Sequence, residues 1–274
     1  MTSEQSTKWN GPAACSWIEA QEMLDQLLKP LEDLLIDAIA ARSARSVLDV
    51  GCGTGGTTVA VARRLGAGGR SIGVDISAPM IAAAKLRAER EGAAATFIAA
   101  DAQTFAFEPK SFDTIISRFG VMFFDDFTAA FANLRRAAGN NAELRFISWR
   151  TPEENSFMTT AERAAAPLLP DLPARVPDAP GQFGLASDTR IREILERSDW
   201  QRIDIRPIDV VCTMPERELL RYITRMGPVG MALQEADDNM HAEVIKIVRP
   251  AFDRYVHGED VRFTAACWMV SAGA

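Results

Sequence analysis

The stretch VLDVGCGTGG, residues 47–56, decides the fold. Its first four residues are typical of a buried strand, and four glycines follow within the next six positions. Gly51, Gly53 and Gly56 have the spacing G-x-G-x-x-G between a strand and a helix, which lets the backbone come close to a ligand. Asp75 closes the next strand, where an acid can accept hydrogen bonds from both ribose hydroxyls. The stretch therefore predicts a site for an adenosine-containing nucleotide.

Asp49 indicates which nucleotide this site takes. The residue lies two positions before the first glycine, so we expect its carboxylate to point toward the loop. Beside the pyrophosphate of NAD that charge would add repulsion, whereas beside an ammonium group it is favourable. A ligand that carries an ammonium is therefore favoured. The alternative is an NAD-dependent oxidoreductase, which leaves both Asp49 and the later pair Asp101-Ala102 unexplained.

Short β-branched runs alternate with amphipathic segments from Ser46 to Trp149. Strands separated by helices of this length imply right-handed crossovers and a parallel sheet. Crowded prolines then interrupt the alternation, which resumes before a second helical stretch and a last strand. We predict an N-terminal helical segment or lid at 1–45, a core at 46–150, 185–212 and 259–274, an insertion at 151–184 and a helical substrate cap at 213–258.

Composition excludes several classes of partner. The chain has 274 residues, a formal net charge of −7 and 47% hydrophobic residues, so it can bury a large core but has no basic stripe for nucleic acid or an acidic membrane surface. No apolar stretch approaches the roughly 20 residues that span a bilayer. The four cysteines are scattered without a CxxC pair, which suggests neither a zinc site nor a disulfide framework. We expect a cytoplasmic protein without a metal.

Four motifs at successive strand ends resemble the class I S-adenosylmethionine-dependent methyltransferases. They are VLDVGCGTG, GVDIS, AADAQTFAF and FDTIISRFGVMFFDD, and they cover at least Ser46 to Trp149. The resemblance is to the bacterial small-molecule branch that includes quinone-ring methyltransferases. It implies a Rossmann-like α/β fold with a seven-stranded, mostly parallel sheet, an antiparallel last strand at Val261 to Val270, and helical insertions over the active site.

The resemblance implies a binding role at the methionyl end of S-adenosylmethionine for five residues. Gly51 and Gly53 would pack against the methionyl part of the cofactor. Asp49 would orient its ammonium, directly or through water. The strand end at Ser117 and Arg118 would place a backbone carbonyl near the same ammonium, where the substrate enters.

A second set of five residues would hold the adenosine end in the same family. Asp75 would accept hydrogen bonds from the ribose hydroxyls, with Ile76 and Met80 flanking the adenine. Asp101 would bind the adenine amino group, and Ala102 would offer its backbone N–H to a ring nitrogen.

The expected reaction is in-line transfer of a methyl group to an oxygen, nitrogen, carbon or sulfur nucleophile of a small molecule. The sulfonium carries the activation, so the protein mainly supplies orientation and exclusion of water. No catalytic dyad is evident, and the sequence does not rank His241, Asp125 and Tyr222 as candidates for a base. A cofactor-binding protein without turnover is a further hypothesis.

Apolar residues stand where family members often have histidines, after the fourth strand: Met122, Phe123 and Phe124. Phe123 and Trp149 are the candidates for a substrate pocket, which favours an aromatic or lipophilic acceptor. The alternative is that these apolar residues belong to the hydrophobic core and do not contact a substrate.

Three further patterns each have two interpretations. Arg118 could bind an acidic substrate or pair with Asp125 or Asp126. Pro30 should kink or split the N-terminal helix. Near the N-terminus, a lid over the cofactor could be formed by Trp9, Trp17 and Gln21. Aromatic residues that flank a helix start more often form a hydrophobic staple, and we favour this second interpretation.

Overall fold

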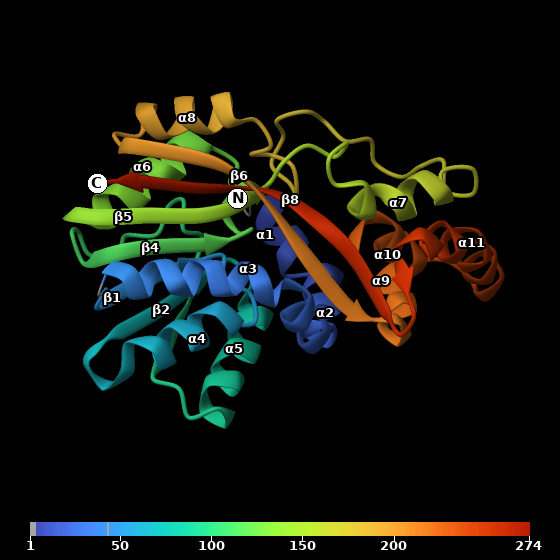
Figure 1. Ribbon diagram of the computed structural model, residues 1–274, viewed down its shortest axis with the longest axis horizontal. Helices are drawn as coiled ribbons and strands as arrows, with labels where there is room; N and C mark the ends of the chain where they lie inside the picture. Colours follow the sequence, from blue (N-terminus) through green and yellow to red (C-terminus); the bar gives the residue numbers. More distant parts are fainter. Residues whose placement is uncertain (1–3, 43) are drawn as a thin grey trace.

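A twisted sheet runs through the computed structural model, which describes residues 4–42 and 44–274 (Figure 1). The strand order is β3-β2-β1-β4-β5-β8-β6, and a two-residue strand, β7, pairs with β8. The pairings among β1 to β5 are parallel, and β8 is antiparallel to β5 and β6. The bounds are β1 Ser46–Val50, β2 Arg70–Asp75, β3 Ala95–Ala99, β4 Phe112–Arg118, β5 Ala138–Trp149, β6 Gln201–Pro215, β7 Val256–His257 and β8 Asp260–Gly273. This arrangement confirms the mostly parallel sheet with an antiparallel last strand, although the short β7 gives the described part of the chain eight strands and not the expected seven.

Helices cover both faces of the sheet. α3, α4 and α5 pack on one face, while α6 and α8 pack together on the other (Figure 1). Each crossover returns the chain to the same edge, which brings the carboxyl ends of β1 to β4 together. The helices are α1 Glu4–Trp9, α2 Pro12–Glu19, α3 Gln21–Arg42, α4 Gly56–Leu65, α5 Ala78–Arg90, α6 Phe127–Ala137, α7 Ser156–Ala165, α8 Asp188–Arg197, α9 Leu219–Arg225, α10 Gly227–Leu233 and α11 Asp238–Ala251.

The N-terminal helix α3 runs without interruption through Pro30. Leu27, Leu31 and Leu35 are almost completely buried on its apolar face. Packing of this face offsets the hydrogen bond that proline removes. The expected split at Pro30 is therefore wrong, and the chain instead breaks at Ala20, between α2 and α3.

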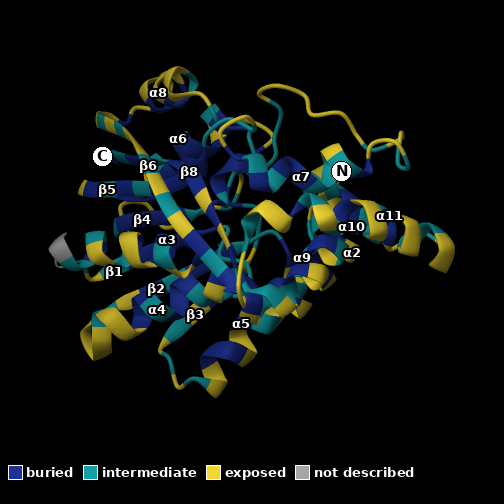
Figure 2. Ribbon diagram, turned by 45° about the vertical axis from the view of Figure 1, so that its right-hand side comes forward, coloured by how far each residue is buried: buried dark blue, intermediate teal, exposed yellow. Residues whose placement is uncertain are grey.

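Strands β6 and β8 continue past the sheet as a two-stranded ribbon. β8 pairs with β5 only from Cys267 onward, whereas its pairing with β6 reaches Pro215 opposite Asp260. The segment between the two strands forms α9, α10 and α11, and α11 packs on α7. Figure 2 shows that these outer helices have exposed outer faces while the central strands are buried. β7 within this segment corrects the expected helix around His257, since a tight turn at Gly258 (φ +66°) joins β7 to β8.

None of the described helices is both long and apolar enough to cross a lipid bilayer.

Candidate functional site

A cavity of about 1480 Å³ lies at the carboxyl ends of β1, β2 and β4. One side is built from the strand ends and the loops that follow them. The other side is built from α7, α9, α10 and the irregular residues 166–184. Ligand sites commonly measure about 300–1,000 Å³, so this cavity has room for two molecules at once.

The glycine loop forms the floor of this cavity. Gly51, Gly53 and Gly55 have φ values of +68°, +54° and +82°, which side-chain-bearing residues rarely adopt. A Cβ atom on Gly51 would lie 2.5 Å from Cα of Gly120, so the loop packs directly against the segment that follows β4. The nearest atom to a Cβ on Gly53 is Sδ of Met80, at 3.9 Å. The loop therefore presents bare backbone to the cavity.

Asp75 stands at the end of β2 beside this loop. Its Oδ2 accepts a hydrogen bond from the backbone N–H of Gly53, and its Oδ1 accepts one from Ser77, both at 2.8 Å. Burial raises the pKa of this carboxyl, an effect that the two backbone donors oppose. Each oxygen retains a lone pair, so Asp75 can still accept two hydroxyl groups from a ligand.

Asp101 and Ala102 lie at the next strand end along the sheet. Oδ1 of Asp101 accepts a hydrogen bond from the N–H of Gln103 at 2.8 Å. Asn133 of α6 donates to the carbonyl of Ala102 at 2.9 Å and so fixes this turn from below. Sequence reasoning missed Asn133, because its distance along the chain gives no hint of the contact.

Asp49 and Ser117 are the two predicted cofactor residues that do not line the cavity. Asp49 is 1% exposed, and its carboxylate accepts a hydrogen bond from Oγ1 of Thr58 at 2.6 Å. Burial raises the pKa of Asp49 to about 6, although the Thr58 hydroxyl and the Arg118 charge lower it. Ser117 donates to the carbonyl of Val50 at 2.7 Å. Both side chains therefore lie outside the cavity lining, next to the glycine loop.

All the other predicted cofactor residues line the cavity together with both predicted substrate residues. They are Gly51, Gly53, Asp75, Ile76, Met80, Asp101, Ala102 and Arg118, with Phe123 and Trp149.

Arg118 does not pair with Asp125 or Asp126, so that expectation is wrong. Its side chain points toward α3, where its Nη1 lies 3.8 Å from Oε2 of Glu32. Asp126 instead caps α6 by accepting a hydrogen bond from the N–H of Ala129. Asp125 is exposed at the cavity wall. The packing of α3 brings Glu32 close to Arg118, and the sequence motif that contains Arg118 does not reveal this packing.

The N-terminal helices cover the cavity from the solvent side. The Trp9 ring meets Phe123 edge to face at 5.2 Å and Trp17 at 5.9 Å. Asn10 donates to the carbonyl of Ile76 at 3.1 Å and accepts from the N–H of Ala78 at 2.9 Å. The favoured interpretation as a helix-start staple is wrong, because Trp17 lies inside α2 and both tryptophans line the cavity.

Two stacked rings form the middle of the cavity wall. Phe119 and Trp149 lie parallel, with centroids 4.4 Å apart and an interplanar angle of 3°. Phe119 has φ +65°, a strained conformation for a bulky residue that costs about 1–3 kcal/mol. Met122 and Phe124 are buried in the core, so only Phe123 of that apolar run is partly exposed. Sequence reasoning missed Phe119.

The candidates for a base are separated by the structure. Tyr222 lines the cavity, where its hydroxyl donates to Sδ of Met158 at 3.3 Å. Burial and the nearby Glu162 charge raise the pKa of Tyr222, which disfavours the phenolate that a base requires. His241 belongs to α11 and does not line the cavity.

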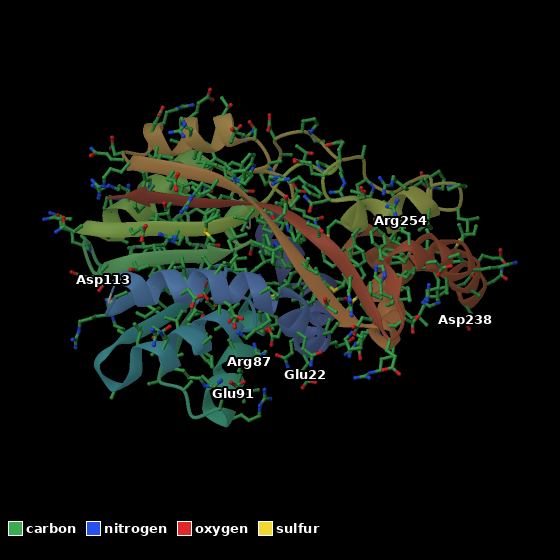
Figure 3. All side chains as sticks on the ribbon, viewed as in Figure 1. Glu22, Arg87, Glu91, Asp113, Asp238 and Arg254 are labelled. Atoms are coloured by element: carbon green, nitrogen blue, oxygen red, sulfur yellow. The ribbon has the colours of Figure 1, made fainter. Side chains whose placement is uncertain are left out.

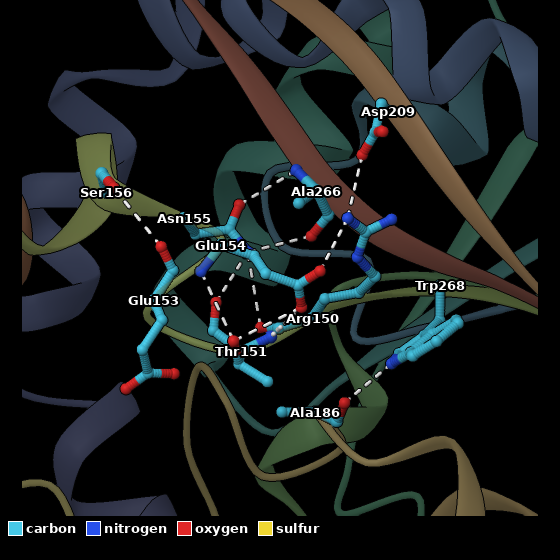
Figure 4. A network of polar contacts seen from close by, with 10 residues as sticks. All are labelled: Arg150, Thr151, Glu153, Glu154, Asn155, Ser156, Ala186, Asp209, Ala266 and Trp268. Carbon is cyan, nitrogen blue, oxygen red and sulfur yellow. Dashed lines mark hydrogen bonds and ion pairs between the residues drawn. The ribbon is translucent and has the colours of Figure 1, made fainter.

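Asn155 fixes the start of α7 on strand β8 (Figure 4). Its amide donates to the carbonyl of Ala266 at 2.9 Å, and its Oδ1 accepts from the N–H of Ala266 at 3.0 Å. Arg150 contacts Glu154 and Asp209 at 2.8 and 3.1 Å. These contacts position α7 relative to β8.

Arg87 fixes the other side of the glycine loop. It forms an ion pair with Asp25 of α3 and donates to the carbonyl of Thr54 at 3.2 Å. Figure 3 shows Arg87 of α5 close to Glu91, the residue that follows the helix, and the ion-pair distance between them is 3.4 Å. The loop is thereby tied to both α3 and α5.

Within residues 4–42 and 44–274, no group of three His, Cys, Asp or Glu side chains could hold a metal ion.

Comparisons with known proteins agree with this geometry. Residues 47–141 match the family model described as a methyltransferase domain. An uncharacterised protein of Mycobacterium tuberculosis is 31% identical over 127 residues, which cover 46% of this chain and 45% of that protein. The demethylmenaquinone methyltransferase of Thermus thermophilus is 28% identical over 141 residues, which cover 50% of this chain and 64% of that enzyme. The two relatives thus match about half of this chain over 45% and 64% of their own length, and the family model covers about a third of this chain.

The fold also matches solved structures. The YcgJ protein of Bacillus subtilis superposes with a TM-score of 0.57 and 17% identity over 88% of this chain and 97% of that one. At that identity the likeness concerns the fold alone, which is a Rossmann-like α/β fold.

Proposed function

We propose that the whole protein is an S-adenosylmethionine-dependent methyltransferase, because residues 47–141 match the methyltransferase-domain family. The observation that carries the proposal is one cavity in which a bare glycine loop and two strand-end acids, Asp75 and Asp101, share the lining with apolar side chains such as Phe157 and Met158. A cofactor and an acceptor can therefore meet inside it.

The residues at the strand ends fit S-adenosylmethionine. Asp75 keeps one free lone pair on each oxygen for the ribose hydroxyls, as its two backbone contacts show. Ile76 and Met80 supply apolar walls for the adenine, beside Asp101 and Ala102. Gly51 and Gly53 leave room for the methionyl part. The buried Asp49, held behind the loop, contributes negative charge toward the ammonium.

The acceptor in this proposal is an aromatic or lipophilic small molecule. Trp149, Phe157, Met158 and Ile223 line the cavity and are apolar. Residues 151–184 and 213–258 would form this substrate side, with residues 1–45 as the lid and the strands as the cofactor side. The relative from T. thermophilus, by its name, methylates a quinone ring, a ligand of this chemical class. We further propose a cytoplasmic location, since the four cysteines are free thiols.

Orientation and desolvation would carry the catalysis. When bound, S-adenosylmethionine supplies an activated methyl group. The stacked Phe119 and Trp149 would hold a planar acceptor, and the lid formed by Trp9 and Trp17 would exclude water. Such positioning can lower a barrier by about 7–11 kcal/mol. If the acceptor must lose a proton, Asp125 is a better candidate than Tyr222, whose pKa is raised by burial.

The testing experiment is calorimetric titration with S-adenosylmethionine, S-adenosylhomocysteine and NAD in parallel. Binding of the two sulfur nucleotides, with no heat from NAD, is the expected result. Transfer of a radioactive methyl group from S-adenosylmethionine to reduced naphthoquinones and naphthols then tests turnover. Binding of NAD alone would refute the proposal in favour of an oxidoreductase, and cofactor binding without transfer to any acceptor tested would favour a binding protein.

A further inference from the structure

Arg118 lines the cavity as a partly buried cation, 15% exposed, with an unpaired guanidinium nitrogen. Its Nη1 is buried, and no atom of the described residues accepts a hydrogen bond from it. Oε2 of Glu32, at 3.8 Å, is beyond hydrogen-bond distance. Four other arginines also have an unpaired buried nitrogen, but each of them has a second nitrogen within 3.2 Å of an oxygen: Arg87, Arg145, Arg150 and Arg190.

The position of Arg118 at the cavity is fixed by the neighbouring loop. Ser117 donates to the carbonyl of Val50 and accepts from the N–H of Gly120, at 2.7 and 3.0 Å. Gly120 in turn packs against Gly51. Because β2 and β4 flank β1, Asp75 and Arg118 stand two strand spacings apart, about 10 Å. Arg118 therefore lies on the cofactor side of the cavity, at the end opposite Asp75, which would bind the ribose.

Glu32 does not satisfy the guanidinium by itself. It is 6% exposed and its other oxygen lies 3.5 Å from Nζ of Lys29, so two cations share one carboxylate. The other cations that line the cavity, among the described residues, are either exposed to solvent or paired with a carboxylate. Lys8 is exposed, Arg175 contacts Glu162 at 2.6 Å, and Arg225 is half-exposed near Glu19. Arg118 is thus the cavity-lining cation that is partly buried and has no hydrogen-bond partner for its Nη1 among the described residues.

We propose that the Arg118 guanidinium binds a carboxylate inside the cavity. A guanidinium matches a carboxylate with two parallel hydrogen bonds, and such bonds are strongest where water is excluded. The carboxylate can come from the amino-acid end of the cofactor or from an acidic acceptor. The place of Arg118 beside the glycine loop favours the cofactor. This inference rests on the proposed function.

Calorimetry with two ligands tests the cofactor source. S-adenosylhomocysteine carries the amino-acid carboxylate, whereas 5′-methylthioadenosine lacks it and keeps the ribose and adenine. Arg118→Gln should weaken S-adenosylhomocysteine by at least about tenfold and change 5′-methylthioadenosine by less than about twofold. Arg225→Gln, at the cavity but outside the cofactor side, should change neither. Arg118→Gln removes the cation beside the buried Glu32 and so can destabilise the fold. If the single variant does not fold, the same titrations are made with the double variant Arg118→Gln, Glu32→Gln.

A second ligand pair tests the acceptor source. Binding of 1-hydroxy-2-naphthoate and of 1-naphthol is measured by tryptophan fluorescence, with and without S-adenosylhomocysteine. If Arg118→Gln spares S-adenosylhomocysteine but selectively weakens the naphthoate, the carboxylate belongs to the acceptor. If neither carboxylate ligand loses affinity relative to its partner, the inference is overturned. If the natural protein binds neither adenosine ligand, the proposed function fails, and the naphthoate pair still decides the role of Arg118.

Discussion

Asp49→Asn removes a buried charge and should stabilise the protein. The carboxylate is 1% exposed, and among the described residues it accepts a hydrogen bond from the Thr58 hydroxyl, which can donate equally well to an amide oxygen. Burial raises its pKa from 3.8 to about 6. A shift of about two pKa units corresponds to a cost on the order of 3 kcal/mol once the group is ionised in both states.

The sign of the pH dependence follows from the raised pKa. Below about pH 4 the carboxyl is protonated in the folded and the unfolded chain, so its burial has no charge cost. Between about pH 4 and 6 the unfolded chain ionises first, and this favours unfolding. Above about pH 6 the full cost applies. The contribution of Asp49 to folding therefore becomes less favourable as pH rises through this window.

Urea unfolding followed by circular dichroism measures the effect. The gain in unfolding free energy of Asp49→Asn over the natural protein should be about 2 kcal/mol larger at pH 7.5 than at pH 4.5. Asp171→Asn, at an exposed site, is the matched control and should show no such difference. An equal effect of Asp49→Asn at both pH values would show that burial does not hold this carboxyl at a raised pKa.

Three further changes test other parts of the site. Asp75→Ala should weaken S-adenosylhomocysteine and 5′-methylthioadenosine alike, by more than about 1.4 kcal/mol in calorimetry, because both ligands keep the ribose; a loss confined to one ligand would contradict the ribose assignment. Asn155→Ala should lower the unfolding free energy by about 2 kcal/mol in urea, since it leaves the buried N–H of Ala266 without its partner, while the Ala266 carbonyl keeps the N–H of Arg150; Ser156→Ala, whose hydroxyl contact is long and exposed, should have little effect. Asn10→Ala should speed the release of S-adenosylhomocysteine in stopped-flow tryptophan fluorescence by freeing the lid from Ile76 and Ala78; an unchanged rate would show that the lid does not gate the cofactor.

The sheet and the cofactor side were predictable because their signals are local. A strand followed by glycines requires positive φ at Gly51 and Gly53, and parallel crossovers bring Asp75 and Asp101 to the same edge whatever the rest of the chain does. What depends on packing between distant elements was not predictable. The partner of Arg118 is set by α3, and the direction of Asp49 is set by Thr58 of α4.

The two sides of the cavity differ in how rigidly they are held. The cofactor side is built on parallel strands whose ladders and buried contacts fix the acids and the glycine loop. The substrate side consists of short helices held by the β6–β8 ribbon and by contacts such as the Asn155 bracket on Ala266. Substitutions on the inner faces of α7, α9 and α10 can therefore change the shape of the acceptor chamber while the strand ends stay in place. Under the proposed function, acceptor choice would be encoded in the residues that the family motifs do not cover.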